Sequence, residues 1–97
     1  MRYLVTFAPE AEDDFRRLPA YHRAAVRDAI NQHLLHEPTR ESKSRIKRLR
    51  EMARPQYRLR VGEIRVFYDV AEGEVQVLGI VYKPGADEWL GRMGVKS

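Results

Sequence analysis

Apolar and polar side chains alternate most regularly between residues 57 and 68, which read Tyr-Arg-Leu-Arg-Val-Gly-Glu-Ile-Arg-Val-Phe-Tyr. Alternation with a period of two predicts β-strands, and Gly62-Glu63 is a two-residue turn of the kind that joins antiparallel strands. Closing the ladder on this turn pairs apolar residues with one another: Val61 with Ile64, Leu59 with Val66, and Tyr57 with Tyr68. The segment therefore predicts a β-hairpin with one apolar face that suits a protein core.

The N-terminal third alternates briefly over residues 2–7 and then changes to helical spacing. Pro9 suits the first turn of a helix, and apolar residues recur at three- and four-residue intervals as far as Leu18. The break at Pro19 ends this helix, and a second helix runs to about His36, just before Pro38. We expect a first strand followed by a helical hairpin whose apolar faces pack on a sheet.

The C-terminal third begins with a final apolar strand at residues 75–82, after which Pro84 opens a short helix. Residues 39–44 read as a polar loop, and the basic segment 45–50 has no assigned conformation. The element order β-α-α-β-β-β-α predicts an α+β fold, with the N-terminal helical hairpin on one face of an antiparallel sheet. With 97 residues and no repeat or linker, residues 1–97 are expected to form a single domain.

Positive charge is concentrated in the middle of the chain. Residues 39–68 hold ten basic and three acidic side chains, a net charge of +7, whereas the whole chain carries +4. Such a basic region indicates a polyanionic partner, although an acidic protein would be drawn to it equally. The chain has no cysteine, no apolar run of membrane-spanning length and no signal-like start, so we expect a cytoplasmic protein without membrane contacts.

The polar face of the expected hairpin carries Arg58, Arg60 and Arg65. The same register places Arg60 directly opposite Arg65, and like charges in that relation destabilise a sheet unless an anion lies between them. Because the planar guanidinium fork matches two phosphate oxygens, the cluster predicts a phosphate clamp. The alternative is that these arginines are solvated, or are paired with Glu63, Asp69 or another carboxylate.

Over nearly its whole length the chain resembles the RelE/ParE superfamily of bacterial toxins from toxin–antitoxin systems. The resemblance rests mainly on the hairpin block, and also on Ala8-Pro9-Glu10-Ala11, Phe15-Arg16-Arg17-Leu18-Pro19, Lys47-Arg48-Leu49 and the final strand that runs into Lys83. Relatives that resemble RelE are ribosome-dependent ribonucleases that cut messenger RNA, whereas relatives that resemble ParE act on DNA gyrase. Both kinds are neutralised by an antitoxin that wraps the toxin.

The resemblance also implies roles for particular residues. It implies catalytic roles for four basic residues: Arg58, Arg60, Arg65 and Lys83. Further contacts to RNA are expected from Lys47, Arg48, Tyr82 and Trp89, the two aromatic residues being candidates for stacking on a base. No metal site and no cofactor is implied. The three histidines, His22, His33 and His36, fall on the helical hairpin and are expected at the surface or the boundary of the core.

Together these features predict a toxin that inhibits translation as a ribosome-dependent endoribonuclease of messenger RNA. The 2′-hydroxyl would attack the adjacent phosphorus without a metal, and Lys83 or Lys47 could protonate the leaving oxygen. Arginine stays protonated, so the general base has no assignment. The expected partners are a cognate antitoxin and the ribosome with its messenger, and DNA only indirectly through the antitoxin. The alternatives are a ParE-like gyrase inhibitor, or a non-toxic relative that retains only antitoxin binding.

Overall fold

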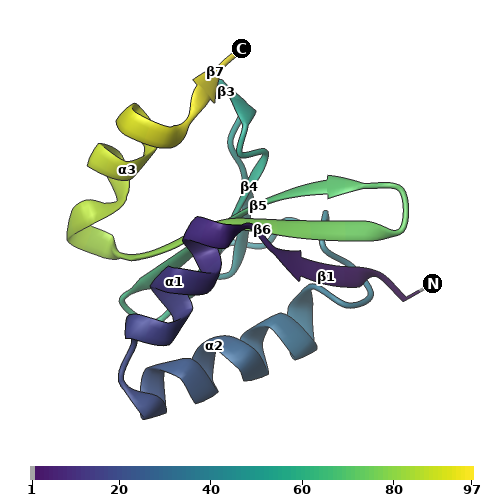
Figure 1. Cartoon of the computed structure of the whole chain (residues 1–97). Helices are drawn as coiled ribbons and strands as arrows, with labels where there is room; N and C mark the ends of the chain where they lie inside the picture. The colour runs from purple at the N-terminus through teal and green to yellow at the C-terminus, as the bar shows by residue number, and fades with distance from the viewer. Residues whose placement is uncertain (1) are drawn as a thin grey trace.

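The computed structural model describes residues 2–97 as a β-sheet with two helices on one face and a third helix on the other (Figure 1). In chain order the elements are β1 (Leu4–Phe7), α1 (Pro9–Arg17), α2 (Ala20–His33), β2 (Ile46–Arg48), β3 (Met52–Arg54), β4 (Tyr57–Val61), β5 (Ile64–Ala71), β6 (Glu74–Tyr82), the 3₁₀ turn η1 (Lys83–Gly85), α3 (Ala86–Met93) and β7 (Val95–Lys96). The predicted α+β fold with an N-terminal helical hairpin on the sheet is confirmed. None of the helices within residues 2–97 is long and apolar enough to cross a bilayer.

The central hairpin has the predicted register. Strands β4 and β5 are antiparallel, with Val61 opposite Ile64, Leu59 opposite Val66 and Tyr57 opposite Tyr68. Gly62 has a φ of 58°, the left-handed conformation that the first residue of this turn requires and that a side chain disfavours.

Two pairings depart from the prediction. The five-stranded sheet has the order β1-β6-β5-β4-β2, and β1 runs parallel to β6, so the sheet is mixed rather than wholly antiparallel. The basic segment left without a conformation supplies β2, which pairs with β4. The β1–β6 pairing joins the two ends of the chain, and local periodicity does not encode such a contact. β2 and β4 lie closer together, but β3 stands between them and pairs with β7 in a separate two-stranded sheet.

The main core lies between the helical hairpin and the sheet. Leu59, Val66 and Tyr68 face the helices and are fully buried, as is Val26 of α2. The Tyr68 hydroxyl donates a hydrogen bond of 2.7 Å to the Pro38 carbonyl, which ties the chain after α2 to the centre of the sheet. This buried layer fixes the orientation of β4 and β5, and with it the direction of their polar side chains.

A smaller core lies on the opposite face, beneath α3. Trp89 stacks on Phe67 with ring centroids 4.8 Å apart and planes 5° from parallel, and Leu78 lies beside them. The ring passes so close to Gly79 that a Cβ at that position would overlap it. This is the face expected to carry the arginines, and α3 covers part of it.

Candidate nucleic-acid interface

Four basic residues share the sheet face opposite the helical hairpin: Lys47 of β2, Arg58 and Arg60 of β4, and Arg65 of β5. We call this set the arginine face. Lys47 lies opposite Arg58, and Arg60 lies opposite Arg65, so the strand register alone brings the four side chains to one surface. Because rigid paired strands hold them, their spacing is set by the sheet and not by a flexible loop.

Arg58 lies at the centre of the arginine face and is half-buried. Its Nε is buried and has no hydrogen-bond partner among residues 2–97. Burial lowers the pKa of Arg58, and the positive charges of Arg65 and Arg60 lower it further. The like charges around Arg58 are costly, and an anion bound at the exposed part of the arginine face would offset their repulsion.

Arg65 is far more enclosed than the sequence suggested, with 6% of its surface exposed. Its Nη1 donates hydrogen bonds to the carbonyl oxygens of Gly62 at 2.8 Å and Ile64 at 3.1 Å. The side chain therefore braces the turn of the hairpin, a role that alternation along the strand could not reveal. By contrast, Arg60 and Lys47 are exposed.

Neither Glu63 nor Asp69, the two carboxylates named above as alternative partners, forms an ion pair with the arginine face in the part of the chain that the structure describes. Asp69 forms an ion pair with Arg54, with Nε and Oδ2 3.3 Å apart, and accepts a hydrogen bond of 2.8 Å from the Gln56 amide. Within residues 2–97, no Asp or Glu oxygen lies within 4.0 Å of a charged nitrogen of the arginine face. The positive charge of the face is thus free to act on an external anion.

Lys83 lies next to the turn of the hairpin. Its backbone amide donates a hydrogen bond of 2.7 Å to the Glu63 carbonyl, and its side chain is exposed. The opposed pair Arg60 and Arg65 is the second pair from the same turn. The backbone of Lys83 therefore lies beside this end of the hairpin, and the catalytic role of its side chain stays a prediction.

The two aromatic candidates do not lie on the arginine face. Tyr82 is opposite Ile64, which places its ring on the side of the helices, where its hydroxyl lies 2.8 Å from Nδ1 of His22. Trp89 is 5% exposed and stacked on Phe67, so its ring is part of the smaller core and cannot receive a base. The structure thus removes the stacking role expected of Trp89 and separates Tyr82 from the arginines.

Arg48 is also turned away from the other basic residues. It lies opposite Tyr57, with its guanidinium carbon 5.3 Å from the centroid of that ring. Its Nη1 donates hydrogen bonds to the carbonyls of Gln56 at 2.8 Å and Leu49 at 3.3 Å. These contacts hold the Arg48 side chain against the fold. Its neighbour Lys47 lies on the opposite side of β2 and belongs to the arginine face.

The arginine face can hold a phosphate and stabilise negative charge on its oxygens, because guanidinium groups donate bidentate hydrogen bonds without losing their charge. Neither a histidine nor a carboxylate is among its four residues. The face therefore provides electrostatic stabilisation, and a proton acceptor must come from elsewhere.

Comparison with solved structures shows what this fold is similar to. The toxin–antitoxin complex RelBE2 of Mycobacterium tuberculosis contains a chain with 27% sequence identity and a TM-score of 0.72, the match covering 84% of this chain and 99% of that one. The archaeal RelE–RelB complex from Pyrococcus horikoshii matches with 23% identity and a TM-score of 0.69, over 86% and 97% of the two chains. The YoeB dimer from Staphylococcus aureus matches with 18% identity and a TM-score of 0.60, over 84% and 98%.

The sequence itself was compared with curated proteins and with protein-family models. No curated protein matches it. The model of the ParE toxin of the type II toxin–antitoxin system parDE matches residues 5–82, which include the helical hairpin, β1 apart from Leu4, and every strand from β2 to β6. The chain belongs to this family of type II toxins, within the RelE/ParE superfamily.

Proposed function

We propose that this toxin acts on RNA: it binds the phosphodiester backbone of messenger RNA on its arginine face and cleaves it on the ribosome, in the cytoplasm. The observation that carries the proposal is the set of four basic side chains on one rigid sheet face, none of which has a carboxylate oxygen within 4.0 Å among residues 2–97. Phosphate oxygens would supply acceptors for the donors of Arg60 and Lys47, which are exposed.

In the proposed reaction the 2′-hydroxyl of the messenger loses its proton to water or to a group of the ribosome, and the 2′-oxygen attacks the adjacent phosphorus. The bond from phosphorus to the 5′-oxygen breaks, leaving a 2′,3′-cyclic phosphate and a 5′-hydroxyl. Arg58 and Arg60 stabilise the charge on the phosphate oxygens, which is commonly the largest catalytic contribution. Lys83 or Lys47 donates the proton to the departing oxygen, and Arg65 positions the hairpin turn.

The arginine face supplies no general base, and this favours dependence on the ribosome. An arginine stays protonated at neutral pH, so it cannot accept the proton from the 2′-hydroxyl. Positioning of the two reacting groups can replace a large part of the missing assistance, since effective molarities reach about 10⁵–10⁸ M in well-oriented systems. We therefore expect the ribosome to hold the messenger in the reactive geometry.

A cognate antitoxin is the second proposed partner. The similar chains from M. tuberculosis and P. horikoshii were solved as complexes with their antitoxins. The concentrated positive charge of residues 39–68 suits a partner with acidic segments, which would compete with RNA for the same surface.

Inhibition of DNA gyrase is the alternative, and the match to the ParE family model is the observation that favours it. Inducing the toxin in cells and following two quantities separates the two functions. Loss of amino-acid incorporation within minutes, with plasmid supercoiling unchanged, supports the ribonuclease. Relaxed plasmids with continued protein synthesis would instead establish a gyrase inhibitor, and normal growth would indicate a relative that has lost its toxicity.

A further inference from the structure

A groove of 510 Å³ lies between the turn that follows β2 and Leu90 of α3, and we call it the β2–α3 groove. Leu49, Met52 and Leu90 supply its apolar lining, and charged side chains between residues 41 and 51 supply the rest. Leu49 and Leu90 also pack against the smaller core, which places the groove on the same side of the sheet as the arginines. This size, and this combination of apolar lining with a few converging polar groups, are typical of ligand sites.

Backbone hydrogen bonds hold the turn that carries the charged residues. The Met52 amide donates a hydrogen bond of 3.1 Å to the Leu49 carbonyl and closes the turn. The Ser97 amide donates one of 3.2 Å to the Glu51 carbonyl, next to the pairing of β3 with β7. Arg50 and Glu51 therefore occupy fixed backbone positions, and a site held in this way loses little entropy when a ligand binds.

Two carboxylates line the groove, and they differ in their contacts. Glu41 accepts a hydrogen bond of 2.9 Å from the Arg48 amide at Oε1 and pairs with Arg50, with Oε2 and Nη2 3.1 Å apart. Glu51 is exposed, and in the described part of the chain no charged nitrogen lies within 4.0 Å of its carboxylate. The carboxylate of Glu51 can therefore accept hydrogen bonds from a ligand.

Lys47 connects the groove to the arginine face, because it belongs to both. It lines the groove, and it lies opposite Arg58 in the pairing of β2 with β4. An RNA strand whose phosphates lie on the arginine face therefore passes beside the groove. The apolar lining suits the flat ring of a base, and carboxylates accept hydrogen bonds from the amino groups of base edges.

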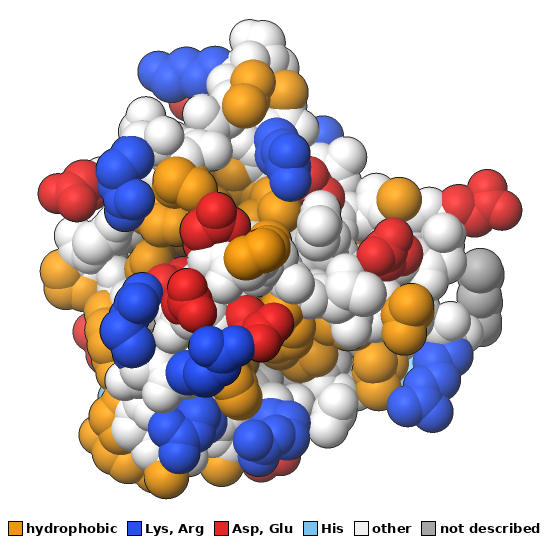
Figure 2. Space-filling model, in the orientation of Figure 1, with side chains coloured by type: hydrophobic (Ala, Val, Ile, Leu, Met, Phe, Trp, Pro, Cys, Tyr) orange, Lys and Arg blue, Asp and Glu red, His pale blue; other side chains and the backbone are white. Residues whose placement is uncertain are grey.

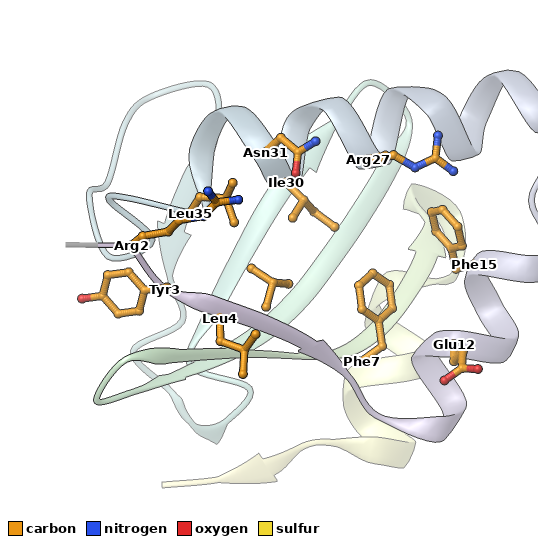
Figure 3. Close-up of a pocket in the computed structure, with 11 residues that line it drawn as sticks. Arg2, Tyr3, Leu4, Phe7, Glu12, Phe15, Arg27, Ile30, Asn31 and Leu35 are labelled. Carbon is orange, nitrogen blue, oxygen red and sulfur yellow. The ribbon is translucent and has the colours of Figure 1, made fainter.

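The other surfaces lack this combination of a basic face with a free acceptor. A larger groove, of 660 Å³, lies beside β1 at the opposite edge of the sheet, and Figure 3 shows mainly apolar side chains around it, among them Phe7, Phe15 and Ile30. On α1, Arg16 and Arg17 pair with carboxylates of the same helix, and Figure 2 shows Lys or Arg side chains beside Asp or Glu side chains on this face. These surfaces therefore offer less attraction to a nucleic-acid strand.

We propose that the β2–α3 groove binds one base of the RNA strand on the arginine face, and that Glu51 selects a base with an exocyclic amino group. Adenine, cytosine and guanine each present such a donor to the carboxylate. Uracil presents a single N–H between two carbonyl oxygens, which the carboxylate repels. Glu51 therefore determines specificity and takes no part in cleavage. The inference rests on the proposed function, because it requires RNA on the arginine face.

The test measures how tightly the purified toxin binds short RNA strands that cannot be cleaved. Hexanucleotides of adenosine, cytidine or uridine with 2′-O-methyl groups lack the attacking hydroxyl, and a fluorescent label reports their binding by anisotropy at low salt. The wild type should bind the adenosine and cytidine strands about tenfold more tightly than the uridine strand, as expected for one hydrogen bond to a charged group. Equal affinities for the three strands, or no measurable binding of any, would overturn the inference.

The variant Glu51→Gln separates base selection from phosphate binding. A glutamine amide both donates and accepts hydrogen bonds, so it can pair with a carbonyl oxygen of uracil as well as with an amino group, and the preference should fall to about twofold or less. The matched control is Glu72→Gln, in the exposed turn between β5 and β6, which should keep the wild-type preference. A Glu51→Gln protein that discriminates as the wild type does would overturn the role of Glu51.

The failure of this inference can be told apart from the failure of the proposed function. Arg60→Gln should weaken the binding of all three strands alike, because a phosphate contact carries no sequence information, whereas Arg92→Gln, on the exposed last turn of α3, should bind as the wild type does. Weaker binding by Arg60→Gln, together with no base preference in the wild type, would refute base selection and leave the arginine face standing. Unchanged binding by Arg60→Gln would contradict the proposed function and this inference together.

Discussion

Arg60 of β4 lies directly opposite Arg65 of β5, and the two side chains differ in their freedom. Arg65 is enclosed and bonded to carbonyls of its own hairpin turn, whereas Arg60 is exposed and free to move. The charge of Arg65 is therefore held in one position, whereas the side chain of Arg60 can move to meet a ligand. Their repulsion is relieved when an anion binds between them, so the arrangement favours the ligand-bound state over the empty one.

Neutralising Arg60 should stabilise the fold while it removes function. Arg60→Gln eliminates the repulsion with Arg65 and keeps most of the side-chain stem, so we expect the free energy of unfolding to rise by up to about 1 kcal/mol. Urea unfolding at low salt measures this, and the gain should shrink in high salt, which screens surface charges. A variant that is less stable than the wild type would contradict the opposed-charge account.

Removing Arg65 should act differently, by loosening the hairpin turn. Arg65→Ala deletes two hydrogen bonds from a charged donor to the Gly62 and Ile64 carbonyls, so we expect a loss of about 1–3 kcal/mol in the free energy of unfolding. The same urea measurement tests this, with Arg92→Ala as the exposed control. An Arg65→Ala protein as stable as the wild type would show that the bonds to the turn contribute nothing.

The packing of α3 depends on the absence of a side chain at Gly79. Gly79→Ala places a Cβ within the space of the Trp89 ring, and overpacking of this kind costs about 1–3 kcal/mol. Trp89 is the only tryptophan of the chain, so its fluorescence reports directly on the displacement. We expect a red-shifted emission maximum as the ring leaves the smaller core. An unchanged spectrum and stability would contradict the described contact between Trp89 and the sheet.

Stability should fall as the pH drops below about 6.5, partly because of His33. Burial of its ring, and then the charge of Arg45, lower the pKa of His33 in the folded state. Between the two pKa values of His33, the unfolded chain therefore binds a proton at this residue more readily than the folded chain does. The stabilising contribution of His33 is present above the unfolded pKa and is lost as the pH falls through the folded pKa. Urea midpoints at pH 7.5 and 5.5 should differ less in His33→Gln than in the wild type. The exposed neighbour His36 provides the control, since His36→Gln should keep the wild-type difference.

The hairpin could be predicted in full from the sequence because its determinants are local. The period of two assigned the strands, Gly62 fixed the turn, and the turn fixed every pair from Val61–Ile64 to Tyr57–Tyr68. The shared face of Arg58, Arg60 and Arg65 followed from the same register. These features need no knowledge of the rest of the chain.

The remaining features depend on contacts between distant segments. The face on which Tyr82 lies depends on the register of β5 with β6, which shifts between Phe67 and Tyr68 and cannot be read from alternation. The burial of Trp89 requires Gly79, ten residues away, to leave room for the ring. His22 was placed on the helical hairpin as expected, but its contact with Tyr82 spans 60 residues and had no local signal.

The central claim, that the arginine face binds the messenger for cleavage on the ribosome, is tested most directly by primer extension in a reconstituted translation system. A defined messenger would be incubated with the wild type, Arg60→Gln or the control Arg92→Gln, each with and without ribosomes. We predict new 5′ ends at codon-spaced positions with the wild type and the control, only when ribosomes are present, and none with Arg60→Gln. An intact messenger with the folded wild type, or full cleavage by Arg60→Gln, would contradict the claim.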